Sequence, residues 1–216
     1  MLMKDRKLGD LRKDFAGREL DVASLPDHPF PLMQQWIEEA LASGDQDANV
    51  MCLATVSPKG FPSARYVLLK DLDERGLVFF TNYESRKAIH LDSNPNAAVS
   101  FYWSALGRQL RIEGRTEKVS EEESDDYFLS RPLVSRINAL ISPQSREIPD
   151  RDYLLNLQQQ ALKKHGDSGP QRPAFWGGYR LIPVWTEFWQ GGPARLHDRI
   201  VYCLFEQKWK RKRLAP

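Results

Sequence analysis

The residues with the clearest chemical potential lie in one short run after a Gly-Gly turn. Arg195, His197 and Arg199 occupy every second position of this run. Side chains two residues apart in an extended chain point to the same side, so we expect all three on one face. Such groups repel one another unless an anion or a polar ligand lies between them. A solvated strand edge is the alternative, but Trp189 and the glycines directly upstream favour a turn that presents this face to a ligand.

A second candidate is the start of a short helix. Ser85 is placed to cap the helix, which puts Arg86 and Lys87 in its first turn. Cations are unfavourable at this end, because the helix N-terminus already carries partial positive charge. A bound phosphate would reverse the sign, since free backbone N–H groups and both side chains could hold it. Two exposed charges with no ligand remain the alternative.

Two further groups of polar residues are less specific. Arg65 and Lys70 lie on an otherwise apolar strand, five positions apart, so simple alternation places them on opposite faces. They could reach one ligand only if the strand bends, bulges or ends at a cleft. Gln144 and Ser145 are hydrogen-bonding groups in a probable turn, where such residues are common without any ligand.

Tyr127, Arg131 and Ser135 are spaced four apart. On one continuous helix they would share a face, and two hydroxyls with a guanidinium could hold a phosphate. Pro132 makes a continuous helix doubtful, and a second helix could begin there.

Several common catalytic motifs are missing from the sequence. It contains no nucleophile elbow, GxGxxG, P-loop or HExxH pattern, and no obvious catalytic pair of acids. Cys52 and Cys203 each lie in an apolar run, which favours buried small side chains, and we predict no metal site. Donors suited to phosphate, together with many aromatics, favour a phosphorylated small molecule and an organic cofactor that supplies the reactivity.

The composition is typical of a globular protein. The 216 residues carry a formal charge of +2, with 41% hydrophobic and 28% charged residues. Near-balanced charge argues against a nucleic-acid binder, although residues 208–213 are basic and leave that class as a rival. We expect no signal peptide and no membrane segment, and the two cysteines fit a cytoplasmic location.

Hydrophobic periodicity predicts a mainly β protein with helices, of the α+β class. We expect a mobile N-terminal arm over residues 1–28 and a single domain over residues 29–216. Short strands joined by tight turns favour a small antiparallel β-barrel with peripheral helices. Helices are expected within 31–44, 83–95, 120–131, 131–142 and 150–166, and strands within 49–57, 62–71, 76–81, 97–103, 108–119, 177–189, 199–207 and 209–216.

The run TEFWQGGPARLHDR, residues 186–199, resembles the signature of the pyridoxine/pyridoxamine 5′-phosphate oxidase family. The likeness extends along nearly the whole chain, through RYVLLK, VFFTNYESRKA, Arg108-Gln109, YFLSRP, Gln144-Ser145, FWGGYR and the terminal RLAP. The resemblance implies an FMN-binding split β-barrel and a homodimer with FMN at the subunit interface. It also implies oxidation of pyridoxamine or pyridoxine 5′-phosphate to pyridoxal 5′-phosphate, with O2 reduced to H2O2 and ammonia released from the amine.

The resemblance also assigns site residues, some of which would come from the partner subunit. Arg195 and His197 would face the pyridine ring and act in catalysis, while a hydride equivalent passes to flavin N5. The substrate would be held by Arg12, Phe15, Lys70, Tyr127, Arg131, Ser135, Arg195 and His197. The FMN would be held by Arg65, Tyr66, Val67, Leu68, Leu69, Lys70, Phe80, Thr81, Arg86, Lys87, Gln109, Gln144, Ser145, Trp189 and Arg199.

Some positions depart from the family pattern. Phe15 stands where a tyrosine is common, so only packing is expected from that side chain. The run SRINALIS (135–142) and Arg146 are also unusual, and the preference between amine and alcohol substrates stays open. Two rivals share parts of this pattern: another split-barrel flavoprotein, which should lack RLHDR and SRP, and a non-catalytic protein that binds flavin or a phosphorylated ligand.

Overall fold

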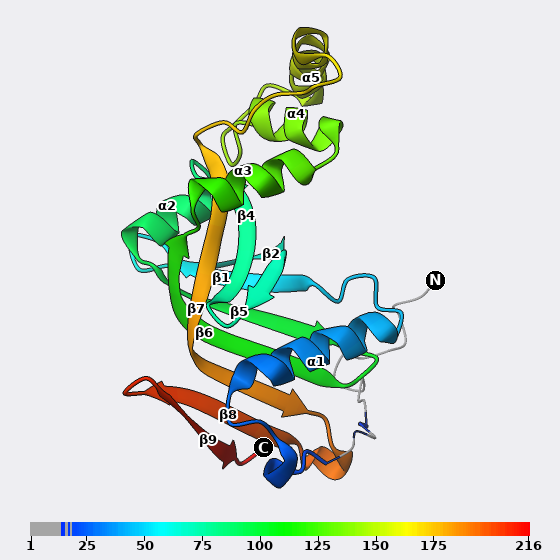
Figure 1. Cartoon of the computed structure of the whole chain (residues 1–216), viewed down its shortest axis with the longest axis vertical. Helices are drawn as coiled ribbons and strands as arrows, with labels where there is room; N and C mark the ends of the chain where they lie inside the picture. The colour runs from blue at the N-terminus through cyan, green and yellow to red at the C-terminus, as the bar shows by residue number, and fades with distance from the viewer. Residues whose placement is uncertain (1–13, 16, 18) are drawn as a thin grey trace, which may run out of the picture. The chain divides into compact units, whose positions relative to one another are not determined.

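The computed structural model describes residues 14, 15, 17 and 19–216. Helices form where the sequence predicts them, and each begins at a residue that satisfies its free N–H groups or fixes its first turn. Ser85 caps one helix, and Ser120 with Glu123 forms a capping box on another. The helices are α1 (Pro29–Ala42), α2 (Arg86–Ser93), α3 (Glu121–Ser130), α4 (Leu133–Ile141) and α5 (Arg151–His165), with short 3-10 turns η2 (Val22–Ser24) and η3 (Pro193–Arg195) (Figure 1).

The strands form one sheet in the order β2-β1-β5-β6-β7-β4-β3, and β8 pairs with both β7 and β9. The ladders that join β1 to β2, β3 to β4, β4 to β7, β7 to β8 and β8 to β9 are antiparallel. The antiparallel arrangement that the sequence predicts is therefore confirmed for these ladders. The strands are β1 (Val50–Val56), β2 (Pro62–Leu68), β3 (Asp71–Asp73), β4 (Gly76–Asn82), β5 (Asn96–Trp103), β6 (Arg108–Lys118), β7 (Trp176–Gln190), β8 (Asp198–Phe205) and β9 (Lys208–Leu214).

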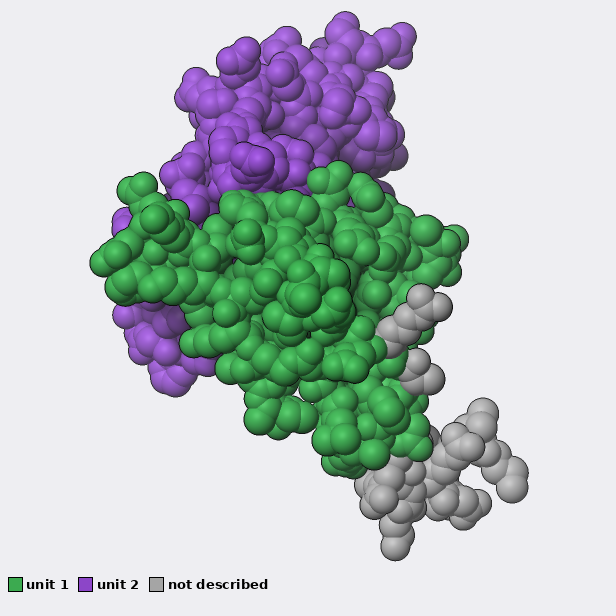
Figure 2. Space-filling model, turned by 60° about the horizontal axis from the view of Figure 1, so that its bottom comes forward, with its two compact units in different colours: residues 1–48, 100–111, 185–216 green, residues 49–99, 112–184 purple. Residues whose placement is uncertain are grey.

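The chain divides into two compact units, coloured separately in Figure 2. Unit 1 comprises residues 1–48, 100–111 and 185–216, and unit 2 comprises residues 49–99 and 112–184. Strands β5, β6 and β7 contribute residues to both units. Most of the resembling motifs before residue 185 fall in unit 2, and the run 186–199 falls in unit 1.

Unit 2 is built on strands with two different burial patterns. β1 alternates between buried and half-buried residues, so that Met51 and Leu53 enter the core. β4 is buried on both faces over most of its length, as its run of apolar residues predicts. The helices α4 and α5 pack against each other (Figure 1).

The core of unit 1 centres on Trp36 of α1. Its ring lies edge-on to Phe188, with 5.1 Å between ring centroids, and to Trp103 at 6.4 Å. The indole N–H of Trp103 donates to the carbonyl of Ala48, so this buried polar atom is satisfied. Aromatic side chains thus fix α1 onto the strands of unit 1.

The end of the expected N-terminal arm is bonded to β8 and β9. The Leu20 N–H donates to Asp198 Oδ2 at 2.8 Å. The hydroxyl of Tyr202 and the guanidinium of Arg211 both donate to the carbonyl of Pro26. Residues 1–13, 16 and 18 lie outside the described part of the chain.

Within the described residues, no helix combines the length and the apolar character that a membrane crossing requires.

Gly114 marks the closest approach of β6 to β7. A Cβ at this position would overlap the backbone carbonyl of Ile182 and lie 3.1 Å from Pro183 Cα. We expect Gly114→Ala to lower the free energy of unfolding by about 1–3 kcal/mol, because backbone atoms must move apart. Arg115→Ala, one residue along the same strand and exposed, should change it by less than about 0.5 kcal/mol. Urea denaturation measures both, and equal stability of the two variants would contradict the packing argument.

Candidate functional site

Unit 2 contains a cavity of about 490 Å³ at the junction of α3 and α4. It collects side chains from the end of β2, from β4, from α2 and from the α3–α4 junction. Most of its walls are residues that the sequence assigned to cofactor or substrate. The lining residues are Tyr66, Val67, Leu68, Lys70, Phe80, Thr81, Lys87, Tyr127, Arg131, Pro132, Ser135, Gln144 and Trp176.

The α3–α4 junction brings three predicted residues to the same cavity without a continuous helix. α3 ends at Ser130, and Arg131 adopts an extended conformation before Pro132. The break follows from the proline, which disfavours a helical residue before it. Tyr127, Arg131 and Ser135 nevertheless all line the cavity. The expectation that Pro132 interrupts the helix is therefore confirmed. The three residues still meet at one cavity, but they do so through the α3–α4 junction and not along one face of a helix.

Arg131 is a cation of this site that no described carboxylate compensates. Its guanidinium lies over the Trp176 ring, 4.8 Å from the ring centroid. Its Nη1 atom is buried and has no hydrogen-bond partner, and burial lowers the pKa of the side chain. None of the described carboxylates forms an ion pair with it. A buried donor without a partner is costly, so an anionic ligand is the natural partner for this group.

A stack of aromatic rings forms one wall of the cavity. Phe80 lies 3.9 Å from Tyr127 and 5.5 Å from Trp176, centroid to centroid, with nearly parallel planes. The ammonium of Lys70 lies 6.0 Å from the Tyr127 centroid. The wall thus combines flat apolar surface with a cation, which suits an aromatic ligand that carries negative charge.

Lys87 is a second, half-buried cation of the cavity. Its ammonium donates to Thr81 Oγ1 at 3.1 Å and to Gln144 Oε1 at 3.0 Å. Burial, followed by repulsion from Arg65, lowers the pKa of Lys87 to about 8. No described carboxylate forms an ion pair with it. An anion at this position would offset both effects and raise the pKa again.

The start of α2 adds a helix N-terminus to these cations. The hydroxyl of Ser85 accepts a hydrogen bond from the Ala88 N–H, as predicted, and Arg86 is exposed at the first helical position. Arg65 is fixed on β2, where its guanidinium donates to the Leu53 carbonyl at 2.8 Å. Burial, followed by the charge of Arg86, lowers the pKa of Arg65. Neither arginine lines the cavity directly, so their contribution to it is an electrostatic field.

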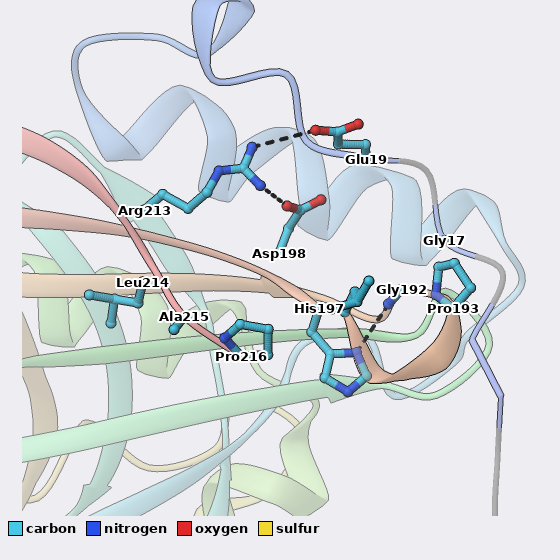
Figure 3. A pocket seen from close by; sticks show the side chains of 11 residues that line it. Gly17, Glu19, Gly192, Pro193, His197, Asp198, Arg213, Leu214, Ala215 and Pro216 are labelled. Carbon is cyan, nitrogen blue, oxygen red and sulfur yellow. Dashed lines mark hydrogen bonds and ion pairs between the residues drawn. The ribbon is translucent and has the colours of Figure 1, made fainter.

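Unit 1 contains a second cavity, of about 740 Å³, beside the run of residues 189–199 that contains Arg195, His197 and Arg199. The Gly192 N–H donates to Nδ1 of His197 at 3.1 Å (Figure 3). Because a backbone N–H can only donate, Nδ1 must accept, and a neutral ring then carries its proton on Nε2. His197 therefore offers an N–H donor on its other edge. In the same cavity Arg213 pairs with Asp198 and lies 3.9 Å from Glu19, so that its charge is compensated.

Phe15, Trp189 and His197 form a ring cluster within unit 1. Phe15 lies edge-on to Trp189 at 5.3 Å and to His197 at 5.8 Å, and Trp189 lies 4.7 Å from His197. Phe15 thus packs against two other predicted site residues. Arg12, predicted to act beside it, lies outside the described residues.

The expected alternation of Arg195, His197 and Arg199 was wrong. Pro193–Arg195 form a 3-10 turn, and β8 begins only at Asp198. Ala194 and Arg195 have left-handed backbone angles, with φ of 49° and 64°. The chain is therefore not extended between Arg195 and Arg199, and the rule for strand faces does not apply there.

Arg199 has a partner that the sequence analysis missed. Its guanidinium donates to both carboxylate oxygens of Glu187, at 2.7 and 3.0 Å, and this pairing raises its pKa. Only 2% of the Glu187 side chain is exposed, so this is a buried, two-pronged ion pair. Glu187 lies opposite Val201 in the β7–β8 ladder, two residues from Arg199. The pairing was missed because the register of two strands cannot be predicted from composition.

The remaining predicted residues are not among those that line the unit 2 cavity. Leu69 is buried in the core of unit 2, and Ser145 is exposed with φ of 72°. Gln109 and Arg195 belong to unit 1, where Arg195 is exposed. Trp176 also lines the cavity but was not predicted to do so, although it directly precedes the two glycines of the FWGGYR motif. Among the described residues, no group of three His, Cys, Asp or Glu side chains could hold a metal.

Arg146, one of the departures from the family pattern, forms an exposed ion pair with Glu84 at 2.6 Å. The run 135–142 supplies most of α4.

Comparisons with protein families match both parts of the chain. Residues 37–156, more than half of its length, match the family model described as pyridoxamine 5′-phosphate oxidase. Residues 176–216 match the pyridoxine 5′-phosphate oxidase C-terminal dimerisation region. A protein of Chromohalobacter salexigens named pyridoxine/pyridoxamine 5′-phosphate oxidase is 53% identical over 97% of this chain and 98% of its own. A protein of the same name from Pseudomonas syringae pv. tomato is 51% identical with equal coverage.

Solved structures agree on the fold. PhzG from Burkholderia lata, solved in complex with tetrahydrophenazine-1-carboxylic acid, has a TM-score of 0.88 and 29% identity, covering 93% of this chain and 100% of its own. A pyridoxamine 5′-phosphate oxidase-related FMN-binding protein from Nostoc punctiforme has a TM-score of 0.72 and 19% identity, over 89% and 100%. The split-barrel class predicted from the sequence is confirmed. By its sequence over nearly the full length and by its fold, the chain belongs to the pyridoxine/pyridoxamine 5′-phosphate oxidase family, a family of oxidoreductases.

Proposed function

We propose that the protein oxidises pyridoxamine or pyridoxine 5′-phosphate to pyridoxal 5′-phosphate with FMN, reducing O2 to H2O2. The observation that carries the proposal is Arg131, a half-buried residue whose buried Nη1 atom has no hydrogen-bond partner, in a cavity walled by stacked aromatic rings. Such a cavity fits a flat ring that carries a phosphate. Relatives about 50% identical carry the name of this activity, which supports the same substrate class.

The residues of unit 2 also fit the phosphate of FMN. Lys87 is a half-buried cation with a lowered pKa, and it bonds only to neutral oxygens. The free N–H groups at the start of α2, with Arg86 beside them and Arg65 close enough to lower the pKa of Lys87, complete a positive field. We assign the FMN phosphate to this region, and the ribityl chain and ring to residues 66–70 with Phe80, Thr81 and Gln144. FMN supplies the two-electron acceptor for the hydride equivalent that leaves the substrate carbon.

The substrate phosphate is assigned to Lys70, Tyr127, Arg131 and Ser135. A guanidinium and an ammonium neutralise its charge, while the hydroxyls of Tyr127 and Ser135 donate hydrogen bonds. This set lines the cavity that contains the aromatic wall. A substrate without phosphate would leave Arg131 unpaired and buried, which is a penalty against binding it.

Unit 1 is assigned to the pyridine ring and to part of the cofactor. His197 holds a proton on Nε2 when neutral, so it can donate to an oxygen or nitrogen of the substrate. Arg195, exposed and held in a left-handed turn, is assigned to the same ring. Trp189, Arg199 and Gln109 are assigned to FMN. The match to a dimerisation region supports a homodimer. We propose that the cofactor lies at the interface of its subunits.

The activity has a direct spectroscopic test. The protein reconstituted with FMN should be yellow, should bleach when pyridoxamine 5′-phosphate is added without oxygen, and should recolour in air. Pyridoxal 5′-phosphate and H2O2 should appear in equal amounts. A protein that takes up FMN but does not bleach belongs to the non-catalytic rival, and one that takes up no FMN contradicts the cofactor assignment.

Arg131→Met removes the guanidinium and keeps an apolar side chain over Trp176. We expect the KM for pyridoxamine 5′-phosphate to rise about 10- to 100-fold, since a charge-assisted bond contributes roughly 1.5–3 kcal/mol. FMN content should not change, because Arg131 is assigned to substrate alone. Arg151→Met, at the exposed start of α5, is the matched control and should leave KM unchanged. An unaltered KM in Arg131→Met would remove the phosphate from this position.

The pKa of Lys87 predicts how FMN affinity depends on pH. Below pH 8 the ammonium is charged and ready to bind, and above pH 8 the free protein loses this proton. Bound phosphate favours the charged form, so binding above pH 8 takes up a proton and the association constant falls as pH rises, at most about tenfold per unit. Fluorescence titration of FMN between pH 7 and 9.5 measures the slope.

Two controls isolate this effect. Lys87→Met should bind FMN more weakly at pH 7 and should lose the slope. Riboflavin, which has no phosphate, should show no slope with the unchanged protein. A slope that persists in Lys87→Met would assign the proton to another group.

A further inference from the structure

A buried arginine on β7 holds the helix that carries the phosphate-binding residues. Only 4% of the Arg180 side chain is exposed. Its two terminal nitrogens donate to different carboxylates, to Asp73 at 2.8 Å and to Glu123 at 2.9 Å. Asp73 lies on β3 and Glu123 lies in the first turn of α3. Arg180 therefore connects three elements of unit 2 at one point.

Glu123 is already committed to the start of α3. Its carboxylate accepts the Ser120 N–H, and its own N–H donates to the Ser120 hydroxyl, which completes the capping box. One carboxylate thus fixes the beginning of the helix and ties that beginning to β7. Because the cap and the ion pair share this side chain, the direction of α3 is coupled to the position of Arg180.

The next two residues of α3 repeat the attachment. The Ser124 hydroxyl accepts the Gly178 N–H at 3.3 Å. Asp125 pairs with Arg172 at 2.6 Å, and Arg172 also donates to the carbonyl of Trp176 at 2.9 Å. Three consecutive residues of α3 are therefore bonded to β7 or to the loop that precedes it.

The glycines before Arg180 allow this close approach. A Cβ at Gly177 would overlap the Tyr83 hydroxyl and lie 3.0 Å from the Ser124 oxygen. The Gly-Gly step thus brings α3 against the strand, and Arg180, two residues further along, sets its polar attachment.

The far end of the same helix reaches the cavity. Tyr127 lies one turn after Glu123, and Arg131 follows the last helical residue. Tyr127 lies on the same side of α3 as Glu123, and Arg131 is joined directly to the last residue of the helix, so a tilt at Glu123 moves both. We propose that Arg180 is a positioning residue, which fixes α3 through Glu123 and so places Tyr127 and Arg131 for the phosphate of the substrate. This inference rests on the proposed function.

Arg75 supplies a matched control. It pairs with the same two carboxylates, with Asp73 at 2.7 Å and Glu123 at 3.0 Å, but 63% of its side chain is exposed. Exposed ion pairs contribute little. Asp73 and Glu123 are about a third exposed, at 34% and 35%, and keep Arg75 as a partner when Arg180 is removed, so Arg180→Met takes away mainly the link between these carboxylates and β7. Arg180→Met and Arg75→Met therefore each remove an ion pair with the same two carboxylates. The two variants differ because Arg180 is buried and belongs to β7, whereas Arg75 is exposed.

We expect Arg180→Met to raise the KM for pyridoxamine 5′-phosphate about tenfold, because the start of α3 loses its bond to a buried residue of β7, with kcat and FMN content nearly unchanged. Arg75→Met should stay within about twofold. The double variant Arg180→Met with Arg131→Met should lose less than the sum of the two single losses, because Arg180 acts in part through Arg131. Additive losses, or a fall in kcat with KM unchanged, would overturn the proposal.

Two further measurements keep the test decisive. Glu123→Gln preserves the capping box and weakens the bond to Arg180, so it should shift KM in the same direction if Arg180→Met fails to fold. Quenching of tryptophan fluorescence by pyridoxal 5′-phosphate compares all variants without turnover. If the unchanged protein neither oxidises the substrate nor binds pyridoxal 5′-phosphate, the proposed function fails; if it does both and Arg180→Met behaves as Arg75→Met, the positioning role alone fails.

Discussion

The candidate site depends on partly buried positive charge that no carboxylate among the described residues neutralises. Lys87 and Arg131 line the unit 2 cavity, and among the described residues neither forms an ion pair with a carboxylate. Elsewhere the chain pairs its buried arginines: Arg180 has Asp73 and Glu123. The desolvation that lowers both pKa values in the cavity is an energetic cost of the folded state without a ligand, and a phosphate removes it on binding.

The surrounding structure positions the Arg131 guanidinium against an aromatic wall. Phe80, Tyr127 and Trp176 form a stack of nearly parallel rings, and the guanidinium lies over the Trp176 ring of this stack. The polar attachment of α3 to β7 acts on the same groups from the other end of the helix. A preorganised site loses less conformational entropy on binding, which favours affinity and orientation together.

The two units contribute different chemistry to the proposed reaction. Unit 2 offers permanent cations and flat apolar surface, which suit binding. Unit 1 offers His197, whose Nδ1 is occupied by the Gly192 N–H and whose Nε2 is therefore a donor. The left-handed residues Ala194 and Arg195 hold this motif in a turn rather than a strand, and such conformations are concentrated at functional sites.

By itself, the sequence determined the elements and the antiparallel class, because caps, turn residues and periodicity are local signals, and Ser85 begins its helix as predicted. Most of the residues that line the cavity followed instead from the resemblance to the family. Only the tertiary structure decided that the run Arg195–Arg199 is not extended, that Glu187 pairs with Arg199 and that Trp176 supports Arg131. These outcomes depend on strand register and on contacts between residues distant in the chain, and no local pattern encodes which partner a buried charge will find.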